Sequence, residues 1–250
     1  MNRPARDTLH PVTPSRVVSL VPSLTEAIAV TLPHVLVGAT DFCTHPEGLD
    51  VARVGGTKYP RMADLLALGP DLVVMNMEEN RRSDADELAA HGIDVHVTYP
   101  RTVGTALDEL ATMLRRLGAT GEPEWLRRAR LAWAEPAPAN RKTAIVPVWR
   151  RPWIVAGGDT FTSDVLRRLG VDNLYNDPDD RYPRPDLEDL VSRKPDLVIL
   201  PDEPYLFTED DGPEAFPGTR CVLVSGRHLT WYGPSLADAR HSLAQAVHGT

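Results

Sequence analysis

The sequence predicts an α/β protein made of two related lobes, each built around a parallel β-sheet. Two observations support this. Short Val-rich runs alternate with amphipathic segments, and the stretch at 58–79 is echoed at 181–204. Strands that alternate with helices at this spacing are typical of parallel βαβ units. An echo about 123 residues apart fits no simple tandem array, so it indicates two lobes of similar architecture.

The first lobe is expected to begin with a Val-rich strand at 16–23, followed directly by a helix. Ser23 is the predicted N-cap of this helix, and Glu26, three residues later, completes a capping box. The elements expected next are a strand at 34–40, a helix, turn and strand over 62–76, and the same order over 84–100.

Two amphipathic helices follow, at 102–118 and 122–135, before a Pro-rich connector. A new strand then begins at KTAIVPVW and the α/β pattern starts again. The predicted organisation is a flexible leader at 1–15, a first lobe at 16–120, a connecting helix at 121–136 and a second lobe at 137–250.

Composition excludes several classes of protein. The formal charge of −8 divides evenly, with 11 basic against 15 acidic residues in 1–120 and 16 against 20 in 121–250. Neither half forms a basic surface, so no nucleic-acid partner is expected. No run of 18 apolar residues occurs, so no membrane insertion is expected.

The N-terminus and the cysteine content favour a cytoplasmic location. The first sixteen residues contain no apolar h-region, and two cysteines, Cys43 and Cys221, are too few for a disulfide framework. A periplasmic or extracellular location would require a signal that had already been removed.

Acidic residues follow the last strand of each echoed segment, Glu78 and Glu79 in the first lobe and Asp202 and Glu203 in the second. Ligands of parallel α/β sheets bind outside the carboxyl ends of the strands. We therefore expect these residues at matching edges of a cleft between the lobes.

Four segments, in this order, resemble the class III (helical-backbone) substrate-binding proteins of vitamin B12, haem and iron–siderophore ABC importers. The segments are SLVPSLTEAI, VGGTKYPRMADLLALGPDLVV, GGDTFTSDVLRRLGVDN and the second PDLVIL. The resemblance covers residues 16–247. It extends to a signal-less, cobalamin-binding-like branch of helical-backbone metal receptors through EEN at 78–80, EPY at 203–205 and WYG at 231–233. It implies two Rossmann-like lobes joined by a single spanning helix around 122–135.

Aromatic residues in predicted loops of the second half suit the stacking of a flat macrocycle, although they would equally pack a core. Polar groups near strand ends would bind the rim of such a ligand, or form surface ion pairs. The aromatic candidates are Trp149, Trp153, Tyr182, Tyr205, Trp231 and Tyr232. The polar candidates are Lys58, Glu78, Glu79, Asn80, Arg101, Arg181 and Glu203.

Two further motifs leave alternatives open. Cys43 and His45 form a C-x-H pair that would supply at most two metal ligands, with His45 the candidate axial ligand. GGDTF at 157–161 lacks the spacing of a nucleotide-binding loop and is better explained as a turn with Asp159 or Thr160 capping a helix. Its amides would still suit an anionic edge of a ligand.

The resemblance implies a non-catalytic binding protein for a metal chelate, with a corrinoid first and haem or an iron–siderophore as alternatives. No cofactor is required, the protein is expected to be a monomer, and an ABC importer is the expected partner if the chain is exported. The rival interpretations are a cytosolic metal- or tetrapyrrole-handling enzyme or chaperone, and a scaffold that has lost its ligand.

Overall fold

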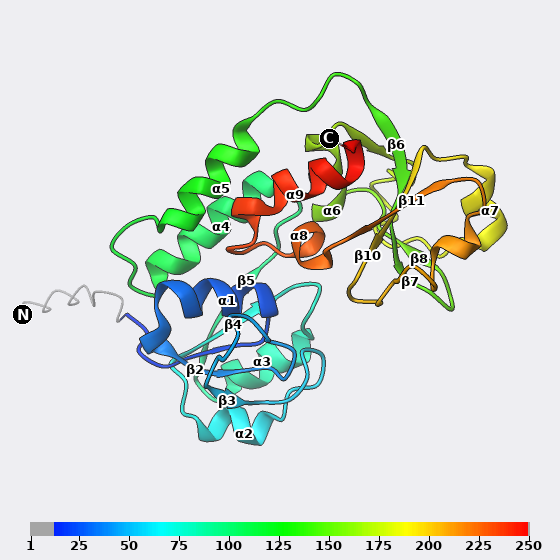
Figure 1. Ribbon diagram of the computed structural model, residues 1–250. Coiled ribbons are helices and arrows are strands. Elements are labelled where there is room, and N and C mark those ends of the chain that lie inside the picture. Colours follow the sequence, from blue (N-terminus) through cyan, green and yellow to red (C-terminus); the bar gives the residue numbers. More distant parts are fainter. Residues whose placement is uncertain (1–12, 250) are drawn as a thin grey trace, which may run out of the picture. The chain divides into compact units, whose positions relative to one another are not determined.

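The computed structural model describes residues 13–249, which form two compact units (Figure 1). Unit 1 contains residues 13–98 and 112–121, and unit 2 contains residues 99–111 and 122–249. The helix expected at 121–136 belongs to unit 2, and its connecting role stays a prediction, as do the predicted lobe boundaries. Most of the expected leader at 1–15 lies outside the described residues.

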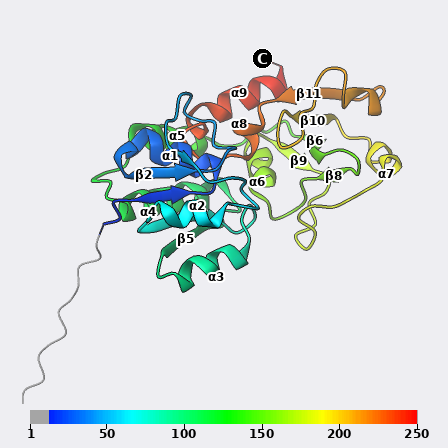
Figure 2. The same cartoon turned by 90° about the horizontal axis from the view of Figure 1, so that it is seen from below.

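Unit 1 contains a five-stranded parallel sheet in the order β3-β2-β1-β4-β5. Helix α1 lies on the opposite side of this sheet from α2 and α3 (Figures 1 and 2). The strands are β1 (Val17–Ser19), β2 (Leu36–Ala39), β3 (Ala52–Arg53), β4 (Leu72–Asn76) and β5 (Asp94–Thr98). The helices are α1 (Pro22–Thr31), the 3-10 turn η1 (Pro33–Val35), α2 (Met62–Ala67) and α3 (Arg82–Ala90). Helix α4 (Val103–Arg116) begins in unit 2, and its residues from Thr112 onward belong to unit 1.

The central strands of unit 1 are buried on both faces. On one face, Val18 and Val73 pack in a cluster with Leu65 of α2 and Leu88 of α3. All five residues of β4 are buried. Parallel strands covered on both sides read as continuous apolar runs, which explains why LVVMN shows no alternation.

Unit 2 contains a four-stranded parallel sheet in the order β11-β10-β6-β9 and a separate antiparallel pair, β7-β8. Helix α7 packs on one face of the sheet through Leu190, whereas α6 and α9 lie on the other (Figure 1). The strands are β6 (Lys142–Ile145), β7 (Pro147–Trp149), β8 (Ile154–Val155), β9 (Val171–Asn173), β10 (Leu197–Pro201) and β11 (Arg220–Val224). The helices are α5 (Glu124–Ala134), α6 (Phe161–Arg168), α7 (Leu187–Ser192), η2 (Pro213–Ala215), α8 (Gly226–Thr230) and α9 (Leu236–His248).

The echoed sequences form equivalent elements in the two units, α2 with β4 and α7 with β10. In unit 1, Asp71 Oδ2 accepts from the backbone N–H groups of Ser15 (2.8 Å) and Arg16 (2.9 Å). In unit 2, Asp196 Oδ2 accepts from the N–H (2.7 Å) and hydroxyl (2.8 Å) of Thr143. These bonds hold the pKa of both carboxyls below their usual range, and the bond from the backbone N–H has the largest effect. Each Pro-Asp step therefore ties its strand to the start of a neighbouring strand.

A buried carboxylate, Asp164, ties helices of unit 2 together. It accepts from the backbone N–H of Val103 (2.9 Å), from Arg168 Nε (2.7 Å) and from Arg167 Nε (3.1 Å). Arg168 also donates to the carbonyl of Trp133 on α5 (3.1 Å). Burial alone would raise the Asp164 pKa, but these donors and charges outweigh it and the pKa is lowered.

The predicted capping box at Ser23 is wrong. Helix α1 starts two residues earlier, with Val21 as N-cap and no side-chain cap, and Ser23 and Glu26 lie inside the helix, both buried. Pro22 causes the shift, because its fixed φ and missing N–H suit the first helical position. By contrast, Thr160 is confirmed as the cap of α6, since its side chain accepts from the Ser163 N–H.

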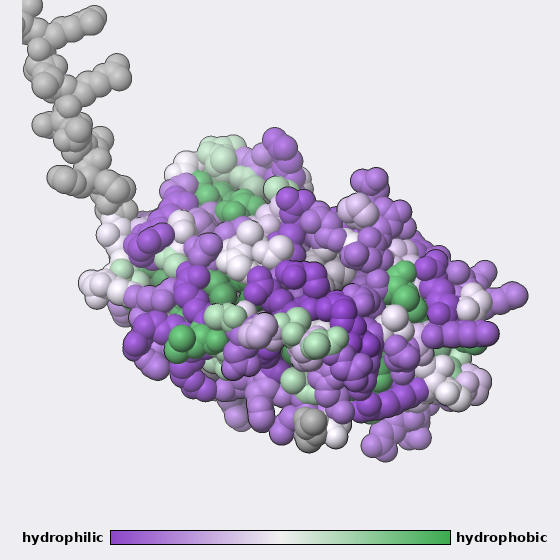
Figure 3. All heavy atoms as spheres, turned by 90° about the horizontal axis from the view of Figure 1, so that it is seen from above, coloured by the Kyte–Doolittle hydropathy of each residue, from purple (hydrophilic) through white to green (hydrophobic). Residues whose placement is uncertain are grey.

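Hydrophilic residues predominate on the face shown in Figure 3, and hydrophobic residues form only small groups there. Large exposed apolar patches usually mark contact surfaces. Among its described residues, this face has no such patch and therefore shows no extended apolar contact surface. None of the helices within residues 13–249 combines the length and the apolar character needed to cross a bilayer.

Candidate functional site

Each parallel sheet presents loops at its carboxyl edge, where ligands of α/β proteins bind. In unit 1 the order of the strands reverses direction at β1, so the crevice beside the end of this strand is the expected binding position. Most of the predicted site residues lie in such loops, and the two units are described in turn.

The loop after β4 holds three of the predicted residues, Glu78, Glu79 and Asn80, and Lys58 from the loop after β3 contacts it. Lys58 Nζ donates to the carbonyl of Glu78 at 2.5 Å. Asn80 is 7% exposed, accepts from the Asn76 N–H (2.7 Å) and donates to the carbonyl of Thr57 (3.0 Å). Lys58, Glu78 and Asn80 are thus brought together, with Asn80 fixing the backbone. Glu79 stays a predicted contact.

Asn76 is a residue that sequence reasoning missed. Its Oδ1 accepts from the N–H groups of Glu78 (2.8 Å) and Glu79 (3.2 Å), and its Nδ2 donates to the carbonyl of Thr98 (3.0 Å). The sequence feature that could have identified it is an Asn as the last residue of the otherwise apolar strand LVVMN. Such side chains bond to backbone groups nearby and stop a strand.

Three large apolar side chains follow three strands of the unit 1 sheet and stay exposed. Phe42 follows β2, Tyr59 follows β3 and Met77 follows β4, with exposed fractions of 65%, 73% and 60%. The guanidinium of Arg81 lies 4.7 Å from the centre of the Tyr59 ring. Sequence reasoning placed the aromatic contacts only in the second half of the chain, and the exposure of these residues was not readable from their type.

The N-terminus of α1 lies directly after β1. Ser23, in its first turn, is 3% exposed, and its hydroxyl has no hydrogen-bond partner among the described residues. First-turn N–H groups also lack acceptors within the helix, and the helix dipole favours negative charge there. The carboxyl end of β1 therefore offers donors to an anionic or carbonyl group.

The C-x-H pair is divided between two environments. The Cys43 thiol is fully buried and lies 3.1 Å from the hydroxyls of both Thr25 and Thr40. Burial raises the pKa of this thiol, so it stays protonated and is a poor metal ligand. His45 Nδ1 lies 3.1 Å from the Thr44 hydroxyl. No group of three or more His, Cys, Asp or Glu side chains in residues 13–249 is placed to hold a metal ion. His45 stays a predicted axial ligand.

In unit 2, two predicted arginines meet around Tyr99. The guanidinium carbons of Arg101 and Arg181 lie 5.6 Å and 5.0 Å from its ring centre, and Arg181 bonds to its hydroxyl. Arg101 pairs with Asp159 at 2.6 Å, and Arg181 Nε donates to the Asp159 carbonyl at 3.0 Å. The two cations are thus brought together around Tyr99 and Asp159.

Trp149 and Tyr205 form an edge-to-face pair at the ends of β7 and β10, with ring centres 5.6 Å apart. Trp149 is 42% exposed. The Tyr205 hydroxyl donates to Asp211 at 2.5 Å, and this bond, with the charges of Arg150 and Arg151, lowers the Asp211 pKa. The bond to Asp211 thus fixes the Tyr205 hydroxyl, and Trp149 beside it is partly exposed.

Other predicted aromatic residues are placed differently. Trp153 packs against the core of unit 2, stacked on Phe207 with ring centres 6.2 Å apart and edge-on to Phe216. Tyr232 is 6% exposed and packs edge-on against Phe161. For both residues the core interpretation is favoured. Tyr182 is 45% exposed and stays a predicted contact, as do Glu203 and Trp231.

The Gly157-Gly158 turn packs against another loop of unit 2, and its suitability for an anionic edge stays a prediction. The Gly157 N–H donates to the Arg181 carbonyl at 2.8 Å. A Cβ at Gly157 would lie 2.1 Å from the Asp180 carbonyl oxygen, and one at Gly158 would lie 2.3 Å from that of Asp177. Both glycines are therefore required by the close approach of another loop.

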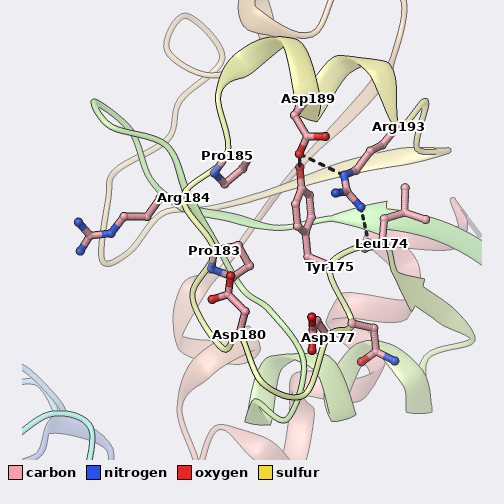
Figure 4. Close-up of a pocket in the computed structure, with 10 residues that line it drawn as sticks. Leu174, Tyr175, Asp177, Asp180, Pro183, Arg184, Pro185, Asp189 and Arg193 are labelled. Atoms are coloured by element: carbon pink, nitrogen blue, oxygen red, sulfur yellow. Dashed lines mark hydrogen bonds and ion pairs between the residues drawn. The ribbon is translucent and has the colours of Figure 1, made fainter.

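A pocket of about 480 Å³ lies in unit 2 beside α7 (Figure 4). Asp189 accepts from the Tyr175 hydroxyl (2.6 Å) and from Arg193 Nε (3.3 Å). Burial, and then the bond to Asp189, raise the Tyr175 pKa. The pocket contains none of the predicted site residues. Its lining is Leu174, Tyr175, Asn176, Asp177, Asp180, Pro183, Arg184, Pro185, Asp189 and Arg193.

Two α/β units, each with polar and aromatic side chains after the ends of parallel strands, define the class of two-lobed α/β binding proteins. Residues 17–216 match the family model described as periplasmic binding protein, and the chain belongs to this family. The fold class expected from the sequence, and the resemblance that implied it, are confirmed. The family's members are substrate-binding proteins, and the expected cytoplasmic location is not supported, because periplasmic proteins are its norm.

Individual relatives agree with this assignment. The vitamin B12-binding protein of Yersinia pestis (strain Pestoides F) is 27% identical over 204 residues, which cover 77% of this chain and 71% of that protein. The periplasmic vitamin B12 binding protein BtuF of Vibrio cholerae has the same fold, with a TM-score of 0.75, 18% identity and coverage of 94% and 97%. The periplasmic heme-binding protein RhuT from Roseiflexus sp. RS-1 also has this fold, with a TM-score of 0.76 and 18% identity. The match covers 94% of this chain and 98% of that protein.

Proposed function

We propose that this protein binds a metal chelate without transforming it, and that the chelate is a corrinoid. Membership of a family of binding proteins supports this, as do relatives named for vitamin B12 and haem. Haem and iron–siderophores are the alternative ligands of the same chemical class. The protein acts as a monomer in the periplasm or outside the cell, and delivers the chelate to an ABC importer.

The observation that carries the proposal is the exposure of large apolar side chains after the ends of parallel strands. In unit 1 these are Phe42, Tyr59 and Met77. In unit 2 an exposed aromatic residue is Trp149, the last residue of the antiparallel strand β7, beside Tyr205 after β10. Burying an aromatic side chain is favourable by about 1.5–3 kcal/mol. A flat ligand with apolar faces would therefore gain from covering these side chains.

Polar groups in the same loops suit the rim of such a ligand. Lys58 and the arginines around Tyr99 offer donors to carboxylate, phosphate or amide oxygens. The buried Ser23 hydroxyl and the first-turn N–H groups of α1 offer a second set. Corrinoids carry amide and phosphate groups at their periphery, and haem carries carboxylates, so both are compatible with these donors.

The test is titration of the purified protein with cyanocobalamin, cobinamide and haemin, followed by visible absorbance and calorimetry. The proposal expects binding tighter than about 100 μM for at least one of them, equivalent to about 5.5 kcal/mol. Tyr59→Ala and Met77→Ala should each weaken that binding about tenfold. Leu131→Ala is the matched control, because Leu131 is 74% exposed but lies on α5, away from any strand end.

If none of the three compounds perturbs the spectra or binds more tightly than about 100 μM, the proposal is wrong. Equal losses for Tyr59→Ala and Leu131→Ala would also contradict it. His45→Ala tests axial ligation separately, since loss of a haem ligand shifts the absorbance of bound haemin.

A further inference from the structure

Glu203 follows β10, and the start of α8 is seated directly on it. The N–H of Gly226, the first residue of α8, donates to Asp202 Oδ1 at 2.7 Å. A Cβ added at Gly226 would lie 2.4 Å from Glu203 Cγ and 2.8 Å from the Glu203 carbonyl oxygen. Only glycine allows the two segments to approach so closely. Helix α8 and the WYG segment after it therefore depend on residues 202 and 203 for their position.

The carboxyl group of Glu203 is partly buried. Its Oε1 is buried and has no hydrogen-bond partner among the described residues, and the indole N–H of Trp231 donates to the same carboxyl. Burial, followed by the charge of Asp202, raises the Glu203 pKa, and the Trp231 bond and the Arg227 charge act in the opposite direction. A buried carboxyl with an unsatisfied oxygen is costly, so its retention calls for an explanation.

We propose that Glu203 is a positioning residue that orients the Trp231 indole for ligand contact and does not touch the ligand itself. This inference rests on the proposed function and on Trp231 as the ligand contact that the sequence predicts. The sequence predicts Glu203 as an acidic contact to the ligand rim, and this inference replaces that expectation. An oxygen that binds a ligand must be accessible, whereas Glu203 Oε1 is buried. Asp202 holds the start of α8 independently, so the Glu203 carboxyl is free to serve the indole.

The first test needs no ligand. Trp231 emission is obtained as the difference between the wild type and Trp231→Phe, and is followed from pH 4 to pH 8. The proposal expects this emission to change at a midpoint above the usual glutamate range, and Glu203→Gln to abolish the change. Glu209→Gln, at an exposed position in unit 2, is the matched control and should leave the change intact.

The charged groups that act on the Glu203 pKa are Asp202 and Arg227. Helix α8, which carries Arg227, also carries the titratable His228. Any component that survives in Glu203→Gln with a histidine midpoint belongs to His228, and His228→Asn should remove it. If Trp231 emission responds to pH identically in the wild type and Glu203→Gln, the proposal is overturned. Circular dichroism establishes that each variant is folded.

The second test uses whichever of cyanocobalamin, cobinamide or haemin binds. Glu203→Gln should weaken binding about tenfold, the scale of one hydrogen bond to a charged group. In the Trp231→Phe background the same substitution should have no further effect, because the indole it orients is gone. An equal loss in both backgrounds would show direct ligand contact and overturn the proposal. If no compound binds the wild type, the proposed function fails, and the fluorescence test still decides the orienting role.

Discussion

Replacing Asp164 with Asn tests whether one buried carboxylate ties α4, α5 and α6 of unit 2 together. Asn keeps the shape and an oxygen for the Val103 N–H, so the backbone bond at 2.9 Å survives. The bond from Arg168 Nε at 2.7 Å loses its charged acceptor, and the amide of Asn would face a guanidinium donor. The substitution therefore isolates the charge.

The expected loss follows from the exposure of the two arginines. Arg168 is 27% exposed, and a hydrogen bond to a charged group in such a place contributes about 1.5–3 kcal/mol. Arg167 is 64% exposed, so solvent screening limits its pair to about 0–1 kcal/mol. Together, unit 2 should lose about 2–4 kcal/mol, which lowers the urea midpoint by about 1–2 M at a typical m-value.

Tryptophan fluorescence is the suitable assay, because all five tryptophans lie between residues 125 and 231 and report on unit 2. Asp108→Asn is the control, since Asp108 is 75% exposed and its partner Arg130 keeps Glu122. The folded-state pKa of Asp164 is lowered, so its contribution is full above about pH 5 and is lost as pH falls through that pKa. A loss below about 0.5 kcal/mol, or an equal loss in Asp108→Asn, would refute this account.

Three further predictions concern the framework of the site. Gly157→Ala should destabilise unit 2 by about 1–3 kcal/mol or more in urea unfolding, because its Cβ would meet backbone at 2.1 Å, whereas Gly121→Ala, in open space, should be nearly neutral. Asn80→Asp should lower the free energy of unfolding of unit 1 by about 2–4 kcal/mol, because a carboxylate cannot donate to the Thr57 carbonyl. Unfolding followed by circular dichroism measures this loss, and an unchanged stability would contradict the assigned bond. In a thiol-reagent assay at pH 8, Cys221 should react well before Cys43, whose buried thiol should react only on unfolding; the reverse order would exclude the described burial.

The sequence predicted the order of strands and helices well, because the two echoed segments carry strong local signals. Pro-Asp-Leu-Val leads into a buried strand in both units, as expected. The start of α1 was wrong by two residues at its cap, since Pro at the first helical position outweighed the Ser-x-x-Glu pattern. Local sequence signals thus determine which helices and strands form. Where two signals compete, as at the start of α1, their balance determines the residue at which the element begins.

Site residues were harder to predict, because exposure depends on packing between distant segments. Trp153 and Trp149 are four residues apart in similar sequence surroundings, yet one packs on Phe207 and the other is 42% exposed. Phe42 and Met77 have side chains that usually enter a core, and nothing local marks them as exposed. Polar residues beside strand ends, such as Lys58 and Asn80, were predictable because topology alone places them there.

Substitutions at Gly157 and Gly158 should affect unit 2 differently from substitutions in the loop that packs on them. The segment at 177–183 runs so close to these glycines that its backbone path is set by them, while the side chains of Asp177 and Asp180 point away into the pocket region (Figure 4). Substitutions within 177–182 can therefore alter surface charge without rerouting the loop. A side chain at either glycine would displace the whole loop, Arg181 included. Directed libraries that seek new ligand preferences would thus gain from varying the loop and leaving the two glycines untouched.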